Sequence, residues 1–184
     1  LTGAGLPIYW NKMPHSGVQM KIDRGGGVTV FCGSTDIGQG SDSVLATIVA
    51  EEFAIDPEQV IVVTADTDLT PVDLGSYSSR VTLMTGNAAI EACRPLKEKL
   101  LSAVAEVFQC TPESLTLSEG RVVSLRDTSK TVDFAEAVQW AEAKFGTLGS
   151  VGSYTPPRRG GKFKGAGVGP VSYTHLRAHE TEAY

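Results

Sequence analysis

The residues from Gly33 to Ser41, Gly-Ser-Thr-Asp-Ile-Gly-Gln-Gly-Ser, have the composition of a turn that holds a ligand through its backbone. An alternating apolar run from Val28 to Cys32 predicts a strand before this glycine turn, and an apolar stripe predicts a helix from Asp42 to Phe53 after it. Together they present N–H groups at the positive end of a helix dipole, where an anion such as a phosphate is stabilised. A plain tight turn explains the glycines equally well, because glycine adopts positive φ readily.

The glycine turn departs from the phosphate-binding loop of nucleotide hydrolases at one important position. That loop carries a lysine just before its hydroxyl residue, whereas this chain has Gln39-Gly40 there. We therefore expect a phosphate or a polar ring to bind at the turn, without phosphoryl-transfer chemistry.

A second polar stretch, which we call the acidic loop, runs from Thr64 to Arg80 and is rich in hydroxyls and short acids. The acids at 66, 68 and 73 suggest calcium, but an EF-hand loop needs glycine at its sixth position and glutamate at its twelfth. Counted from Asp66, these positions hold Pro71 and Tyr77, so turn and capping chemistry is the better explanation. We expect three serines of the loop to cap the following helix or to donate to a bound anion: Ser76, Ser78 and Ser79.

Composition excludes several classes of function. The chain has 184 residues, 41% of them hydrophobic, a net charge of -5 and a pI near 5.2, which argues against a nucleic-acid partner. No apolar run approaches the roughly 20 residues of a membrane span, and no signal peptide is visible. The three scattered cysteines favour reduced thiols in a cytoplasmic protein. The first residue is Leu1, so we expect the natural N-terminus to lie upstream.

The remaining periodicities predict an α+β fold with a mixed sheet and packed helices. A half-buried strand at 18–22 turns back into the strand at 28–32, and a short buried strand at 60–63 is expected in the same sheet. A long helix from about Ser79 to Phe108 should kink or split at Pro95. Further predictions are a hairpin around 119–120, a helix from a capping box at 133 and 136 to about 144, and a strand at 148–154.

Residues 171–184 do not continue any earlier pattern. From Val171 to Thr181 they match, codon by codon, the translation of a common sequencing adapter, so we expect them to be a non-native tail. This excludes His175 and His179, which would otherwise suggest a metal pair. The natural sequence is then expected over residues 1–170.

The glycine turn and the acidic loop together resemble the molybdopterin-binding large subunit of the molybdenum hydroxylase family, the xanthine dehydrogenases, aldehyde oxidases and carbon monoxide dehydrogenases. That family carries a Gly-Gln-Gly turn at a helix start, here Gly38-Gln39-Gly40. It also carries a serine-rich loop before a helix with a Gly-x-Ala step, here 76–80 and Gly86-Asn87-Ala88. Within the family, residues 6–11, 14–17 and 74–87 are similar to the alpha subunits of 4-hydroxybenzoyl-CoA reductases.

The resemblance implies that residues 1–170 are part of a molybdenum cofactor-binding domain. It implies a molybdopterin with molybdenum, in its cytosine dinucleotide form, with iron–sulfur clusters and FAD on partner subunits. The residues that match the family's cofactor contacts are Gly38, Gln39, Gly40, Ser78, Ser79 and Arg80, with Gln39 near an oxo ligand. The pterin dithiolene holds the metal, so no protein ligand is expected. No residue here matches the family's catalytic glutamate.

Three functions remain open at this point. The first is reductive dehydroxylation of an aromatic acyl-CoA thioester, 4-hydroxybenzoyl-CoA, to benzoyl-CoA during anaerobic aromatic degradation. The second is oxidative hydroxylation of an aldehyde or an N-heterocycle on the same scaffold. The third is a non-catalytic module that binds a nucleotide or a pterin.

Overall fold

The computed structural model describes residues 15–76 and 80–156. Its main sheet has the strand order β3-β2-β1-β7. The hairpin of β1 (Ser16–Ile22) and β2 (Val28–Cys32) is antiparallel, and β7 (Gly149–Tyr154) adds to the other edge of β1. Strand β3 (Val60–Thr64) runs parallel to β2, because helix α1 (Ser41–Phe53) carries the chain back between them. The expected mixed sheet is confirmed.

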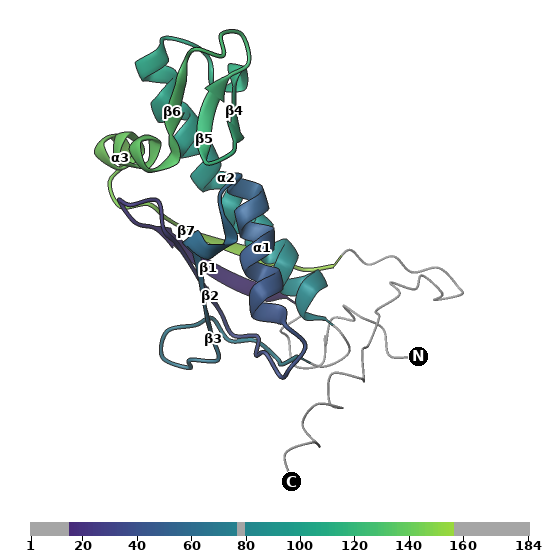
Figure 1. The fold of residues 1–184 in the computed structure, drawn as a ribbon. Helices are drawn as coiled ribbons and strands as arrows, with labels where there is room; N and C mark the ends of the chain where they lie inside the picture. The colour runs from purple at the N-terminus through teal and green to yellow at the C-terminus, as the bar shows by residue number, and fades with distance from the viewer. Residues whose placement is uncertain (1–14, 77–79, 157–184) are drawn as a thin grey trace, which may run out of the picture.

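Helices α1 and α2 (Val81–Phe108) cover one face of this sheet (Figure 1). Small residues let β7 approach α2 closely: a Cβ on Gly152 would overlap the backbone of Ala88 and Ala92. The Ser150 hydroxyl also donates to the Ala92 carbonyl at 2.7 Å. The small residues of α2 thus allow β7 to pack closely against it.

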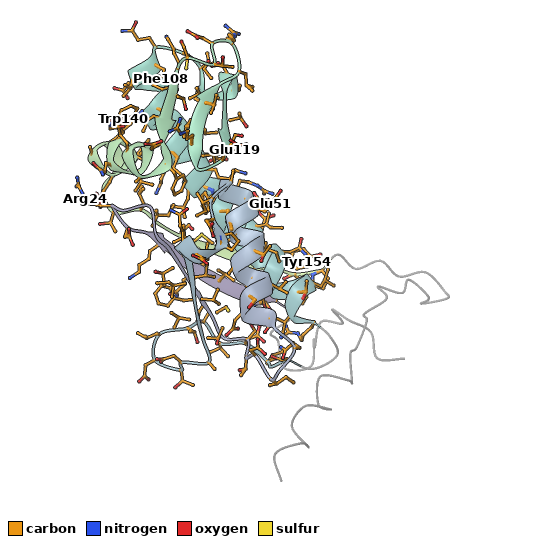
Figure 2. The ribbon with its side chains drawn as sticks, in the orientation of Figure 1. Arg24, Glu51, Phe108, Glu119, Trp140 and Tyr154 are labelled. Atoms are coloured by element: carbon orange, nitrogen blue, oxygen red, sulfur yellow. The ribbon has the colours of Figure 1, made fainter. Side chains whose placement is uncertain are left out.

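A second, smaller group of elements lies around the C-terminal half of α2 (Figure 1). A 3-10 turn, η3 (Pro112–Ser114), leads into the antiparallel sheet β4-β5-β6, with β4 at Leu115–Ser118, β5 at Arg121–Ser124 and β6 at Thr131–Asp133. Helix α3 (Phe134–Phe145) packs beside it. The rings of Phe108 and Trp140, both labelled in Figure 2, meet edge to face with centroids 6.2 Å apart. This part has its own apolar core.

The hairpin turn of this second part lies beside the end of α1. The Gly120 amide donates to the Ala54 carbonyl at 2.6 Å, and Figure 2 shows Glu119 near the end of α1 that carries Glu51. The main core lies between the first sheet and the two long helices, with Leu45, Phe53 and Leu96 fully buried. None of the helices in the described ranges is long and apolar enough to cross a membrane.

The structure decides three further local predictions. Helix α2 continues through Pro95 as one element, so of the kink or split expected there the split does not occur. The capping box at 133 and 136 is wrong: Asp133 is the N-cap of α3 but makes no side-chain capping bond, and its carboxylate pairs with Arg121 at 3.0 Å across β5 and β6. Strand β3 is an edge strand rather than a buried one, with Ile61 63% exposed.

Candidate functional site

The topology places the two polar stretches at the same end of the main sheet. The glycine turn leaves the carboxyl end of β2, and the acidic loop leaves the carboxyl end of the parallel strand β3, with Cys32 opposite Thr64. Ligands in α/β sheets bind outside the carboxyl ends of parallel strands. The sheet thus brings together two segments that the sequence separates.

Two hydrogen bonds and one tight backbone contact join these loops directly. The Thr35 amide donates to the Ser76 hydroxyl oxygen at 3.1 Å, and that hydroxyl donates to the Thr35 carbonyl at 2.5 Å. A Cβ on Gly33 would overlap the Pro71 carbonyl, so only glycine lets the acidic loop lie this close. Ser76 therefore joins the two loops, whereas its predicted role as a helix cap is not observed.

Inside the glycine turn, the carboxylate of Asp36 accepts hydrogen bonds from the start of α1. Oδ1 accepts from the amides of Gly38 at 2.8 Å and Gly40 at 3.2 Å, and Oδ2 lies 3.4 Å from the amide of Asp42. Desolvation disfavours the charged form, but the backbone N–H groups of the turn outweigh it and lower the pKa of Asp36. The anion at this helix start is therefore the chain's own side chain.

The side chain of Gln39 folds back over the same turn. Its Oε1 accepts from the Ile37 amide at 2.6 Å, and its Nε2 donates to the Thr35 carbonyl at 3.1 Å and to the Ser41 hydroxyl at 3.0 Å. The Thr35 carbonyl consequently accepts from both loops. Gln39 is exposed, and its role toward an oxo ligand stays a prediction.

The outer side of the turn is open. Gly38 and Gly40 have φ of +97° and +72°, and no described atom lies within 4 Å of a Cβ placed on either residue. A planar ligand can approach the backbone there without meeting a side chain.

Arg80 lies on the inner side of the acidic loop. Its guanidinium donates to Asp73 Oδ1 at 2.6 Å and to the Ser16 hydroxyl at 3.1 Å, while that hydroxyl donates to Asp73 Oδ2 at 2.7 Å. The Arg80 and Asp73 side chains are only 5% and 2% exposed. These contacts fasten the loop to the start of β1, and contact between Arg80 and a cofactor stays a prediction.

One carboxylate beside the turn is poorly compensated. Asp42 accepts from the Thr64 hydroxyl at 3.3 Å through Oδ2, but its buried Oδ1 has no hydrogen-bond partner among the described residues. Burial and the neighbouring charge of Asp36 raise the pKa of Asp42.

Sequence reasoning found the glycines and Gln39 but missed the roles of Asp36 and Thr35. The signal for Asp36 was available, because an Asp two residues before a glycine commonly accepts from the backbone of its own turn. Ser78 and Ser79 lie outside the described residues. Asp66, one of the acids weighed for calcium, instead accepts from the Asp68 amide at 3.0 Å, as turn chemistry predicted.

Within the described ranges no group of three His, Cys, Asp or Glu side chains is placed to hold a metal ion. The site offers backbone amides, hydroxyls and an open glycine surface, which suit an organic ring system with polar edges.

Comparison with known proteins identifies the relatives of this chain. Residues 2–180 match the family model described as the molybdopterin cofactor-binding domain. The gamma subunit of the 6-hydroxypseudooxynicotine dehydrogenase complex of Paenarthrobacter nicotinovorans is 42% identical over 123 residues, covering 64% of this chain and 15% of that protein. The xanthine dehydrogenase molybdenum-binding subunit of Escherichia coli O157:H7 is 35% identical over 109 residues, covering 59% of this chain and 14% of that protein.

A solved structure has the same fold. Carbon monoxide dehydrogenase from Oligotropha carboxidovorans superposes with a TM-score of 0.70 at 26% identity, covering 77% of this chain and 18% of that one. The chain thus spans less than a fifth of the length of these proteins. By its family match, its relatives and its fold, the chain belongs to the molybdopterin cofactor-binding domain family, within the molybdenum hydroxylases.

Proposed function

We propose that the full-length protein is the molybdenum-binding subunit of a molybdenum–pterin oxidoreductase, and that this chain forms one wall of its cofactor cleft. One observation carries the proposal. In a chain that matches the cofactor-binding family over residues 2–180, the two family loops leave the same sheet end and meet at the Thr35 carbonyl. The bound cofactor supplies the redox chemistry, and the chain supplies its surroundings.

Each matched residue then has a part in holding the cofactor. The backbone of Gly38 and Gly40 borders a ring of the pterin, because their outer side is open. Gln39 orders the turn through its amide, and the family resemblance assigns it a place near an oxo ligand of the metal. The family resemblance assigns Ser78 and Ser79 as donors to the cofactor, and Arg80 fixes the acidic loop through its buried contacts with Asp73.

We propose the cytosine dinucleotide form of the cofactor, and iron–sulfur and FAD subunits that carry its electrons. The word "complex" in the name of the Paenarthrobacter relative supports partner subunits. The cysteines support a reducing, cytoplasmic setting: Cys32 and Cys93 are buried free thiols, and burial raises the pKa of Cys93 to about 12.

The substrate is proposed to be an aromatic or N-heteroaromatic ring. The activities named for two relatives, a 6-hydroxypseudooxynicotine dehydrogenase and a xanthine dehydrogenase, favour oxidation of a nitrogen-containing substrate. The second candidate is reduction of 4-hydroxybenzoyl-CoA, which the resemblance of residues 74–87 favours.

Two assays of the purified complex separate these candidates. N-heterocycles are offered with an artificial electron acceptor, and 4-hydroxybenzoyl-CoA is offered with a low-potential donor. We expect turnover in the first assay, and turnover in the second alone would reverse the assignment. Absence of molybdenum and of pterin fluorescence after acid release would reject the oxidoreductase and leave a binding module.

A variant tests the site itself. We expect Gln39→Ala in the full-length subunit to lower both molybdenum content and turnover, because the turn loses three hydrogen bonds. Gln19→Ala is the matched control, since Gln19 is exposed on β1. Unchanged molybdenum content and turnover in Gln39→Ala would contradict the placement of the cofactor at this turn.

A further inference from the structure

The start of α1 has the amide arrangement of a phosphate site, yet those amides are already engaged. Helix α1 has no side-chain cap from its N-cap residue, Gly40. Asp36 replaces that cap from four residues upstream and accepts from the amides of 38, 40 and 42. An incoming phosphate would have to displace this carboxylate and lie beside the second acid, Asp42.

The same carboxylate also sets the shape of the turn. Gly38 and Gly40 both adopt positive φ, and ordering a glycine costs more conformational entropy than ordering any other residue; their amides converge on Asp36 Oδ1. The Gln39 side chain completes the turn from the other side through Ile37 and Thr35. All of these bonds lie within the turn, so its geometry does not require a bound ligand.

We infer that Asp36 is a positioning residue: it occupies the anion position at the start of α1, closes that position to phosphate, and presents the Gly38–Gly40 backbone to an uncharged ring of the cofactor. The phosphate groups of the cofactor then bind elsewhere. This inference rests on the proposed function for the identity of the ring, while the closure of the helix start to phosphate does not depend on it.

The test is hydrogen–deuterium exchange of residues 37–42 in the complete, cofactor-free subunit. In Asp36→Ala we expect this segment to exchange roughly 5- to 30-fold faster, the effect of losing a helix cap. Millimolar inorganic phosphate should slow the exchange again in Asp36→Ala and leave the wild type unchanged. Asp36→Asn keeps one oxygen acceptor and should lie between the two, and it carries the test if the alanine variant does not fold.

Asp23→Ala is the matched control. Asp23 also accepts from two glycine amides of its own turn, Gly25 at 2.7 Å and Gly27 at 3.1 Å, but in the β1–β2 hairpin. The variant Asp23→Ala should speed amide exchange in residues 23–27 alone, and phosphate should not change the exchange of residues 37–42.

Molybdenum and pterin content of the loaded subunit is the second measurement. We expect both to fall several-fold in Asp36→Ala and to stay unchanged in Asp23→Ala. The inference is overturned if residues 37–42 exchange at the wild-type rate in Asp36→Ala, if phosphate protects the wild type equally, or if cofactor content survives the loosened turn. A wild type without molybdenum and pterin would reject the proposed function, while the exchange data would still decide the closure to phosphate.

Discussion

The glycine turn and the acidic loop lie at one end of the sheet but are held in opposite ways. Residues 37–40 of the glycine turn are exposed, and the acceptor of the helix-start amides, Asp36, lies within the same turn. The acidic loop is fixed by a nearly buried ion pair, Asp73–Arg80, whose arginine also donates to Ser16 at the start of β1. Hydrogen bonds within one turn do not depend on the packing of other segments. A buried ion pair is stable only when the elements around it keep both charges paired and hydrogen-bonded.

The difference suggests a division of labour within the proposed cofactor cleft. The glycine turn presents a preformed backbone surface, open on its outer side. The acidic loop is held through a contact with β1, which lies far from it in the sequence. Its geometry therefore depends on correct packing of Ser16 against Asp73. Thr35 is the point where the two systems meet, because its carbonyl accepts from Gln39 and Ser76.

Removing one partner of the buried ion pair should have the largest effect. Arg80→Ala leaves Asp73 buried and uncompensated, and we expect a loss of about 3–5 kcal/mol in the free energy of unfolding. Arg24→Ala breaks an exposed ion pair with Glu142, in which the arginine side chain is 70% exposed, and should cost about 0–1 kcal/mol. Denaturant unfolding of the purified chain measures both. Equal losses in the two variants would show that the acidic loop does not depend on this pair.

Gly33→Ala should come next, because it separates the loops sterically. The added Cβ would overlap the Pro71 carbonyl, and overpacking of this kind costs about 1–3 kcal/mol. Gly149→Ala is the control, since its Cβ would meet the Met20 carbonyl at an ordinary 3.5 Å. Thermal unfolding should show a lower Tm for Gly33→Ala alone. A similar shift in both variants would mean that the cost is a general effect of replacing strand-end glycines.

Ser76→Ala removes the hydrogen bonds between the loops and leaves their backbones in place. We expect a loss of about 1 kcal/mol, because the Thr35 amide and carbonyl each lose a partner. Exposed Ser43 provides the control variant Ser43→Ala. Faster amide exchange at Thr35 in Ser76→Ala, without faster exchange in the second sheet, would locate the effect. Exchange unchanged at Thr35 would contradict the joining role of Ser76.

Sequence reasoning predicted those parts of the fold whose signals are local. The strands around Val18 to Cys32 and the hairpin at Gly120 follow from alternation and turn chemistry, and the structure confirms them. Three-residue β6 is too short to show a period. Strand β6 is defined by its antiparallel pairing with β5, which local sequence does not reveal.

The candidate site shows the same limit more sharply. Glycines and serines indicated two candidate ligand-binding loops, but which hydroxyl joins them depends on a contact between residues 41 positions apart, Thr35 and Ser76. The inward direction of Arg80 likewise depends on Ser16, 64 positions away. Sequence composition identifies polar residues of this kind. Whether they face a ligand or each other depends on how the strands of the sheet pack.

The smallest expected effect lies within the glycine turn, where two neighbouring carboxylates titrate in opposite directions. The pKa of Asp42 is raised by burial and by the charge of Asp36, so ionised Asp42 destabilises the fold, and this cost grows as pH rises through its titration above 3.8. Asp42→Asn should therefore raise the Tm by about 1 °C at neutral pH and make no difference below pH 3.8.

Asp36→Asn should show the opposite pattern. The pKa of Asp36 is lowered, so its carboxylate stabilises the fold above pH 3.8, and this stabilisation is lost as pH falls through its folded pKa. The variant should be less stable than the wild type at neutral pH, and the two should converge in acid. Thermal unfolding between pH 2 and pH 7 distinguishes the two variants by sign alone. If Asp42→Asn and Asp36→Asn shift the Tm in the same direction, Asp36 does not act as the internal cap of α1. The glycine turn would then not be held by its own carboxylate, in contrast to the ion-paired acidic loop.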